Sequence, residues 1–183
     1  MSETARLFLP IPWDDPTLDN EMTHKNAGRD PSSVSEQLPD PGSVIEKLVA
    51  GLPAGVAAIT KGKRPDGEVY VRVEPRNLSA SPIEAWGGGH IRYYVYLGKT
   101  TNLEILSGST AVIGVESPVE ALQAICSAVF AGDFEETIWR VGGRISKSLS
   151  RLVIRGEVHT IRGLHGFYVL GRRRKEHLTY APY

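Results

Sequence analysis

The amino-acid sequence predicts an α+β domain, in which a mostly antiparallel sheet carries two helices on one face and follows a flexible N-terminal arm. Three observations lead to this prediction. Two segments, beginning near Ser43 and Ser117, have the capping residues and apolar spacing of helices. Short runs of alternating apolar and polar residues, typical of half-buried strands, lie between and after them. Residues 14–42 are rich in Asp, Pro and Ser, and they lack the apolar surface that would offset their ordering entropy.

The predicted organisation has three parts: a flexible arm at residues 1–40, a single α+β domain at 41–175 and a C-terminal tail at 176–183. Within the arm, the run Leu7–Trp13 carries five large apolar side chains in a proline-stiffened stretch. Such a segment needs a groove, either on its own domain or on a partner, and the sequence leaves both alternatives open. The 183 residues are enough for one domain with a sizeable core.

The first helix is expected to begin with a capping box, in which Ser43 and Glu46 satisfy the first free N–H groups. Gly51 and Pro53 should end it. The strands expected in the first half of the chain are Gly55–Thr60, Glu68–Glu74, Ile91–Leu97, Leu103–Leu106 and Ala111–Val115.

Period-two alternation assigns faces within two of these strands. In Glu68–Glu74 the valines should be buried and the polar residues wet. In Ile91–Leu97, Tyr93 should point inward, and Tyr94 and Tyr96 outward.

The second helix has the stronger signals. Ser117 is its expected cap, Pro118 its first residue and Glu120 the partner in a capping box, while Gly132 ends it. The strands expected after it are Thr137–Val141, Leu149–Ile154, Glu157–Ile161 and Phe167–Leu170, with a tight turn at Arg155–Gly156.

The net charge of zero hides a strong asymmetry along the chain. Residues 1–136 carry 11 Lys/Arg and 19 Asp/Glu, whereas residues 137–183 carry 10 Lys/Arg and 2 Asp/Glu, so the two parts have charges of −8 and +8. Clustered like charge usually persists where water or an opposite charge meets it. A basic second part therefore indicates a surface that meets water or a partner.

Motifs for catalysis and metal binding are weak. Gly87–Gly89 is followed by His90 and a strand, not by the helix start that a phosphate loop requires, so we interpret it as a turn. The five histidines lack the spacing of a zinc site, and Cys126 lies among apolar residues in the middle of a helix. We therefore expect no metal, no cofactor and a core role for Cys126. The single cysteine and the absence of a signal-like start predict a cytoplasmic protein without a membrane partner.

Carboxylates are equally uninformative. Glu135 and Glu136 are neighbours in a predicted strand, so their side chains should point to opposite faces, and we interpret them as solvated strand-edge charge. An enzyme with a dispersed site, assembled from His90, His159 and Glu136, remains an alternative.

The basic residues form the main candidate surface. Arg140, Arg144 and Arg151 lie on or between strands beside Trp139, and the run Arg172–Lys175 follows the last predicted strand. Such charge can protect an edge strand, dock an acidic protein or the chain's own acidic N-terminal segment, or bind nucleic acid.

Tyr, Trp and Arg are the residues that most often dominate protein interfaces. The candidate partner-binding residues are therefore Trp86, Tyr94, Tyr96, Trp139, Arg140, Arg144 and Arg151, and the candidate nucleic-acid-binding residues are Arg172, Arg173, Arg174 and Lys175.

A family resemblance rests on residues 116–162. The segments Phe134–Arg140, Gly143–Ile145 and Arg151–Glu157, which follow a helix ended by Gly132, resemble small single-domain actinobacterial proteins of the immunity type encoded beside polymorphic toxins. The resemblance implies a stoichiometric inhibitor that covers a toxin's active site. It identifies no site residues.

The functional prediction from the sequence is thus a non-enzymatic protein-binding module, of the immunity type, that recognises a protein partner. A nucleic-acid-binding protein that uses the C-terminal basic residues is the alternative, and the dispersed enzyme site is a second alternative. The oligomeric state is left open.

Overall fold

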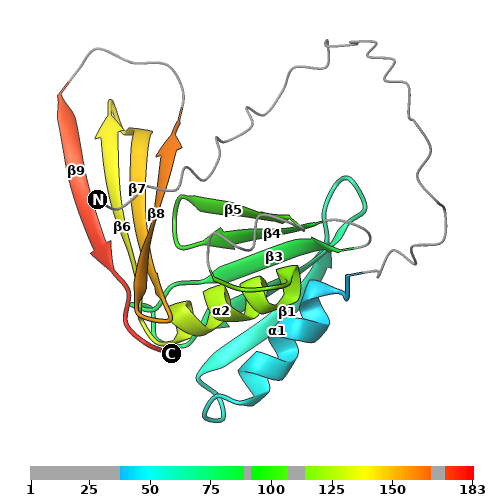
Figure 1. Ribbon diagram of the computed structural model, residues 1–183. Helices are drawn as coiled ribbons and strands as arrows, with labels where there is room; N and C mark the ends of the chain where they lie inside the picture. Colours follow the sequence, from blue (N-terminus) through cyan, green and yellow to red (C-terminus); the bar gives the residue numbers. More distant parts are fainter. Residues whose placement is uncertain (1–37, 89–91, 107–113, 166–171) are drawn as a thin grey trace, which may run out of the picture.

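The computed structural model describes residues 38–88, 92–106, 114–165 and 172–183. They form two helices and two antiparallel sheets, one of five strands in the order β1-β2-β3-β4-β5 and one of four in the order β8-β7-β6-β9. The α+β class is therefore confirmed, with the strands divided between two sheets. Figure 1 shows the four-stranded sheet standing beside the five-stranded one, with both helices packed on the latter. The predicted flexible arm lies almost entirely outside the described residues.

Helix α1 spans Pro41–Ala50, and Asp40 caps it by accepting a hydrogen bond from the backbone N–H of Ser43 at 3.1 Å. The expected capping box of Ser43 and Glu46 is therefore wrong. Pro41 suits the first helical position because its φ is already helical and it has no N–H to satisfy. The helix begins at this proline, two residues earlier than Ser43, because Asp40 supplies the capping carboxylate.

The five-stranded sheet is a meander in which each strand pairs with its neighbour in the sequence. Its strands are β1 Ala57–Lys63, β2 Val69–Pro75, β3 Ile83–Gly88, β4 Arg92–Leu97 and β5 Thr101–Leu106. As predicted, Val71, Val73 and Tyr93 are buried, and Tyr96 is exposed on the opposite face. Val69, also expected to be buried, is 45% exposed, so that part of the prediction is wrong. The strand β3 was not predicted, because the glycines at its end are typical of turns. The strand expected at Ala111–Val115 lies mostly outside the described residues.

Helix α2 spans Pro118–Phe130, with Ser117 accepting a hydrogen bond from Glu120 N–H as the sequence predicts. Its apolar face supplies Leu122, Ile125, Cys126 and Val129 to a core shared with α1 and the five-stranded sheet. Neither described helix is long and apolar enough to cross a membrane.

The four-stranded sheet follows α2 in the chain. Its strands are β6 Phe134–Val141, β7 Arg144–Ile154, β8 Glu157–Leu164 and β9 Arg173–Thr179. The β7–β8 turn lies at Arg155–Gly156 as predicted, and Arg155 takes a positive φ of 53°. The strand predicted at Phe167–Leu170 falls mainly on residues 166–171, which lie outside the described residues. Residues 176–179, expected in a C-terminal tail, instead belong to β9 and pair with β6.

The residues after β9 also pack into the domain. Tyr180 stacks on Phe134 with ring centroids 5.1 Å apart, and Tyr183 packs on Phe130 at 4.7 Å. The Tyr183 hydroxyl donates a hydrogen bond of 2.5 Å to the backbone oxygen of Ser81. Residues 180–183 are therefore not a free C-terminal tail, because the rings of Tyr180 and Tyr183 pack against the core.

A buried carboxylate joins the two sheets. Glu136 in β6 is 0% exposed, so its interpretation as solvated strand-edge charge is wrong. Its Oε1 accepts from the N–H and hydroxyl of Thr100, at 3.0 and 2.7 Å, and from the hydroxyl of Thr101 at 2.7 Å. Its Oε2 accepts from Lys99 N–H at 2.8 Å and from the Tyr180 hydroxyl at 2.6 Å. Five donors thus compensate the desolvation of this charge.

The turn between β4 and β5 supplies three of these donors: the N–H of Lys99 and the N–H and hydroxyl of Thr100. The residue before them, Gly98, has to be glycine. Gly98 has a φ of +57°, which favours glycine, and a Cβ there would overlap Glu136 Oε2 and lie 2.6 Å from the Tyr180 hydroxyl oxygen. The turn can approach the carboxylate so closely only because residue 98 has no side chain.

The substitution Gly98→Ala should destabilise the domain by the cost of a positive φ, about 1 to 2 kcal/mol, plus about 1 to 3 kcal/mol for the overlap. Gly142→Ala is the matched control, because Gly142 has nearly the same φ of +58° with no atom within 4 Å of an added Cβ. Urea denaturation would measure both. Equal losses in the two variants would contradict the close packing at Gly98.

Candidate functional site

The predicted partner-binding residues lie on two separate surfaces. Trp86, Tyr94 and Tyr96 belong to β3 and β4 of the five-stranded sheet, whereas Trp139, Arg140, Arg144 and Arg151 belong to β6 and β7 of the other sheet. The structure therefore does not bring them together as one site. It shows instead two surfaces with different chemistry.

The first surface is the helix-free face of the five-stranded sheet, which we call the aromatic–arginine face. Its residues are Arg64, Arg72, Trp86, Arg92, Tyr94 and Tyr96. Antiparallel register places Arg72, Glu84 and Tyr96 in one row across β2, β3 and β4. Tyr70, Trp86 and Tyr94 form the next row. Residues directly opposite each other point to the same face, so both rows project away from the helices.

Stacked groups hold this face in place. The rings of Trp86 and Tyr94 stack with centroids 5.5 Å apart, and the Arg64 guanidinium lies 4.2 Å from the Trp86 centroid. Arg92 lies 5.3 Å from the Tyr94 centroid. Trp86 is only 8% exposed, so it supports Tyr94 instead of presenting a surface of its own, whereas Tyr96 is 39% exposed. Burial, followed by the charge of Glu104, raises the pKa of Tyr94, so its hydroxyl stays protonated at neutral pH.

The charges on the aromatic–arginine face are balanced. Arg92 lies 2.9 Å from Glu104, Arg72 lies 3.1 Å from Glu74, and Arg64 lies 4.0 Å from Glu84. Each arginine therefore has a carboxylate beside it. A face of this kind has no strong field of either sign.

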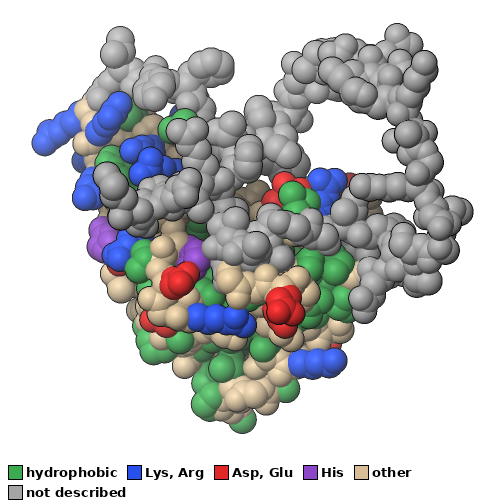
Figure 2. Space-filling view, in the orientation of Figure 1, with side chains coloured by type: hydrophobic (Ala, Val, Ile, Leu, Met, Phe, Trp, Pro, Cys, Tyr) green, Lys and Arg blue, Asp and Glu red, His purple; other side chains and the backbone are tan. Residues whose placement is uncertain are grey.

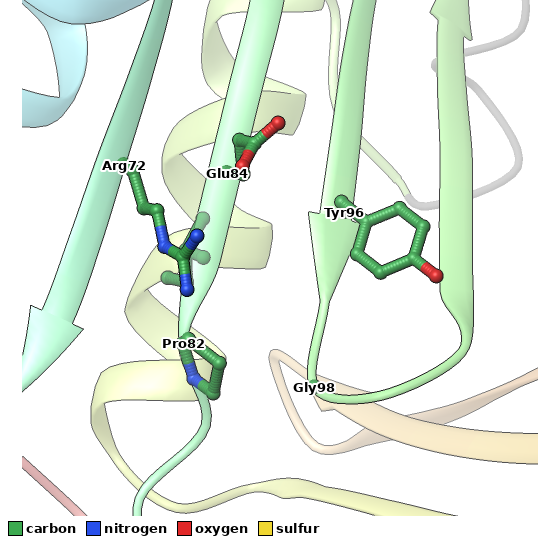
Figure 3. A pocket seen from close by; sticks show the side chains of 6 residues that line it. Arg72, Pro82, Glu84, Tyr96 and Gly98 are labelled. Carbon is green, nitrogen blue, oxygen red and sulfur yellow. The ribbon is translucent and has the colours of Figure 1, made fainter. Parts of the chain in front are cut away.

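A shallow depression of about 170 Å³ lies on the same face. Arg72, Pro82, Ile83, Glu84, Tyr96 and Gly98 line it. Figure 3 shows the side chains of Arg72, Glu84 and Tyr96 around this depression, with a helix on the far side of the sheet. It thus combines a cation, a carboxylate and a phenol in a small space.

The second surface lies at one end of the four-stranded sheet, where the pairing of β9 with β6 gathers two predicted clusters. Lys175 lies opposite Trp139, Arg174 opposite Arg140 and Arg173 opposite Val141. We call this region the basic end, and its residues are Arg140, Arg144, Lys147, Arg172, Arg173, Arg174 and Lys175. The candidate nucleic-acid-binding residues and Arg140 and Arg144 thus lie together. Figure 2 shows Lys and Arg side chains gathered over this part of the molecule.

Negative charge is scarce at the basic end. Glu176 lies 3.4 Å from Arg140 and 2.8 Å from Lys99, and these cations lower the pKa of Glu176. Among the described residues, no carboxylate lies within ion-pair distance of the other cations of the basic end. Like charges in neighbouring strands repel each other, so an anion that binds here relieves repulsion.

Trp139 stands between two lysines on the outer face of this sheet. The Lys147 and Lys175 ammonium nitrogens lie 4.9 and 5.9 Å from the Trp139 ring centroid. Arg151, further along the same face, is paired with Glu135 at 2.7 Å and is therefore separate from the basic end. On the opposite side of the sheet, Phe134 and Leu152 join the main core, and α2 contacts β7.

Of the dispersed enzyme site, the structure describes only Glu136 and His159. Both oxygens of Glu136 are occupied by the donors described above, and no hydrogen bond joins it to His159 among the described residues. His90 lies outside the described residues. Burial raises the pKa of the Cys126 thiol to about 12, in line with its predicted core role. The described residues contain no group of three His, Cys, Asp or Glu side chains placed to hold a metal.

A serine–histidine pair was missed from the sequence. Ser148 Oγ lies 2.8 Å from His165 Nε2, and burial lowers the pKa of His165. The two residues are 17 positions apart, and only the β7–β8 pairing brings them together. Ser148 is 2% exposed, so this pair contributes to the polar interior around Glu136 and Ser150.

No known protein family, curated protein or solved structure matches this chain. The two surfaces and their chemistry therefore carry the functional interpretation.

Replacing Glu136 by Gln should cost about 3 kcal/mol of stability, because an amide nitrogen would face N–H and O–H donors in a buried position. Glu135→Gln is the control, since the neighbouring carboxylate pairs only with exposed side chains, Arg151 at 2.7 Å and His177 at 3.7 Å, and it should cost about 1 kcal/mol or less. Urea denaturation midpoints would measure the difference. A Glu136→Gln variant as stable as wild type would refute the structural role of this carboxylate.

Proposed function

We propose that this protein is a non-enzymatic protein-binding module, and that it binds its partner through the aromatic–arginine face. The observation that carries the proposal is a preorganised, charge-balanced sheet face that exposes Tyr94, Tyr96, Arg72 and Arg92. Tyrosine and arginine are among the residues that contribute most to protein interfaces.

Preorganisation supports the proposal because binding costs less when side chains are already ordered. The stack of Arg64, Trp86 and Tyr94 and the ion pair of Arg92 with Glu104 hold these side chains before any partner arrives. The antiparallel register fixes the rows beneath them. A partner therefore meets rigid aromatic and guanidinium groups.

The dimensions and charge of the face favour a protein over a small molecule or a polyanion. Pockets that hold drug-sized ligands typically have volumes of about 300 to 1,000 Å³. The depression beside Tyr96, at about 170 Å³, suits a single side chain of a partner. The paired carboxylates cancel the field that would attract a polyanion.

The kind of partner is proposed from the sequence, in which residues 116–162 resemble immunity-type proteins. We propose that the partner is a toxin encoded beside this protein, and that binding covers the toxin's active site. Inhibition of this kind needs shape and charge complementarity but no catalytic group on the inhibitor. The residues described above supply such a surface.

The substitutions Tyr94→Ala and Tyr96→Ala should each weaken binding to the product of the adjacent gene by about 30-fold or more. Arg162→Ala, on an exposed position of β8 in the other sheet, is the control and should leave the affinity within a few-fold. Isothermal titration calorimetry would measure the affinities, and circular dichroism would confirm that the variants fold.

Unchanged affinity in both tyrosine variants would exclude the aromatic–arginine face as the contact. Growth assays that co-express the two genes would test inhibition separately. If the adjacent product binds but is not toxic, the immunity-type function fails while the protein-binding function stands.

A further inference from the structure

We infer that the basic end, together with Trp139, is a binding site for single-stranded nucleic acid. This site is independent of the proposed protein-binding face, because it lies on the other sheet and carries excess positive charge, whereas the charges on that face are balanced. Three features carry the inference: the number of cations, their arrangement on the sheet, and an aromatic ring in their midst.

The cations at the basic end come from three strands and the residue before β9. Arg173 and Arg144 lie on either side of Val141, and Lys175 and Lys147 lie on either side of Trp139. Apart from Arg140, these side chains are exposed. Glu176 is the one carboxylate described within the sheet end, and Arg140 and Lys99 already occupy it. The phosphates of a nucleic acid would neutralise the Lys and Arg charges that no described carboxylate pairs with.

The sheet arranges four of these cations, Arg144, Lys147, Arg173 and Lys175, as a grid on the face of Trp139, whereas Arg140 and Arg174 alternate to the other face. Arg173 and Lys175 are two residues apart in one strand, so they face the same side about 6.7 Å apart. Neighbouring strands are about 4.8 Å apart, which places the Lys147 and Lys175 strands about 10 Å apart across β6. Successive phosphates of an extended strand have a spacing similar to that of Arg173 and Lys175. A backbone that follows β9 would therefore meet a cation at each of two successive phosphates.

Trp139 supplies the second element that single-strand binding requires. Its ring lies between the ammonium groups of Lys147 and Lys175 on a face that no described helix covers. Stacking of a base on an aromatic ring is worth more than an exposed cation–π contact. A base can thus replace one ammonium group over the ring, and the displaced lysine can then bind the adjacent phosphate.

The geometry favours a single strand over a duplex or an acidic protein. A duplex keeps its bases stacked inside, so it would use the cations and leave Trp139 without a role. An acidic protein would also have no specific use for the ring. Leu164, 53% exposed and in the same row as Trp139 and Lys147, extends the apolar surface available to an unstacked base.

Fluorescence anisotropy with the full chain and labelled oligo(dT) or oligo(U) of about 12 nucleotides would test the inference. Between about 50 and 200 mM salt, the logarithm of the binding constant should fall with log salt with a slope of about −3 for four phosphate contacts. Arg173→Ala and Lys175→Ala should each reduce the slope by about 0.7. Trp139→Leu should weaken binding about 5- to 100-fold without changing the slope, and Trp139→Phe should restore most of it.

Matched controls separate this site from the other one. Arg72→Ala, on the aromatic–arginine face, should leave oligonucleotide binding unchanged, and Tyr96→Ala should do the same. The inference is overturned if no binding occurs at the lowest salt, or if Trp139→Leu binds as tightly as wild type. It is also overturned if a duplex, or polyglutamate as a mimic of an acidic protein, competes as well as the single strand. None of these results bears on binding of the adjacent gene product.

Discussion

The arrangement of this protein depends on one buried charge. Glu136 is withdrawn from water and surrounded by donors from the β4–β5 turn, from Thr101 and from Tyr180. An ionised carboxylate in such a place is tolerated only while its partners stay in position. The directions of these bonds therefore fix where the second sheet sits against the first. The separation of the two candidate surfaces is a consequence of that geometry.

The zero net charge of the chain is the sum of two surfaces that behave differently. On the five-stranded sheet, each of three arginines lies beside a glutamate, either within one strand, as for Arg72 and Glu74, or across neighbouring strands, as for Arg92 and Glu104. On the four-stranded sheet, cations lie opposite each other or on either side of an uncharged residue. The paired charges of the aromatic–arginine face favour a specific partner at short range, whereas the unpaired cations of the basic end attract an anionic partner from a distance. One chain thus presents both kinds of recognition.

Local signals in the sequence predicted much of the fold. The caps of α2, the inward position of Tyr93 and the burial of Cys126 follow from short-range spacing and were confirmed. The start of α1 was predicted too late, because a serine and a glutamate at capping-box spacing competed with the better placed Asp40.

Features that depend on distant contacts were not predictable. The pairing of β9 with β6 joins residues about 36 positions apart, and nothing in either strand alone indicates the other. The same pairing assembles the basic end, so the run Arg172–Lys175 was predicted but not its position beside Trp139. Glu136 was misjudged because its donors come from residues 99–101 and 180, which no local pattern connects to it.

The position of the last residues has a consequence for how the chain acquires its structure during synthesis. The ribosome synthesises the five-stranded sheet and α2 well before residues 173–183. These later residues add β9 to the second sheet and the Tyr180 hydroxyl to the donors around Glu136. They also supply Tyr183, which contacts Ser81, 102 positions earlier in the chain. Until then, the carboxylate lacks the Tyr180 hydroxyl and β6 has one open edge. The nascent chain therefore passes through a state in which β6 has an exposed edge that can pair with another strand, and such edges favour aggregation.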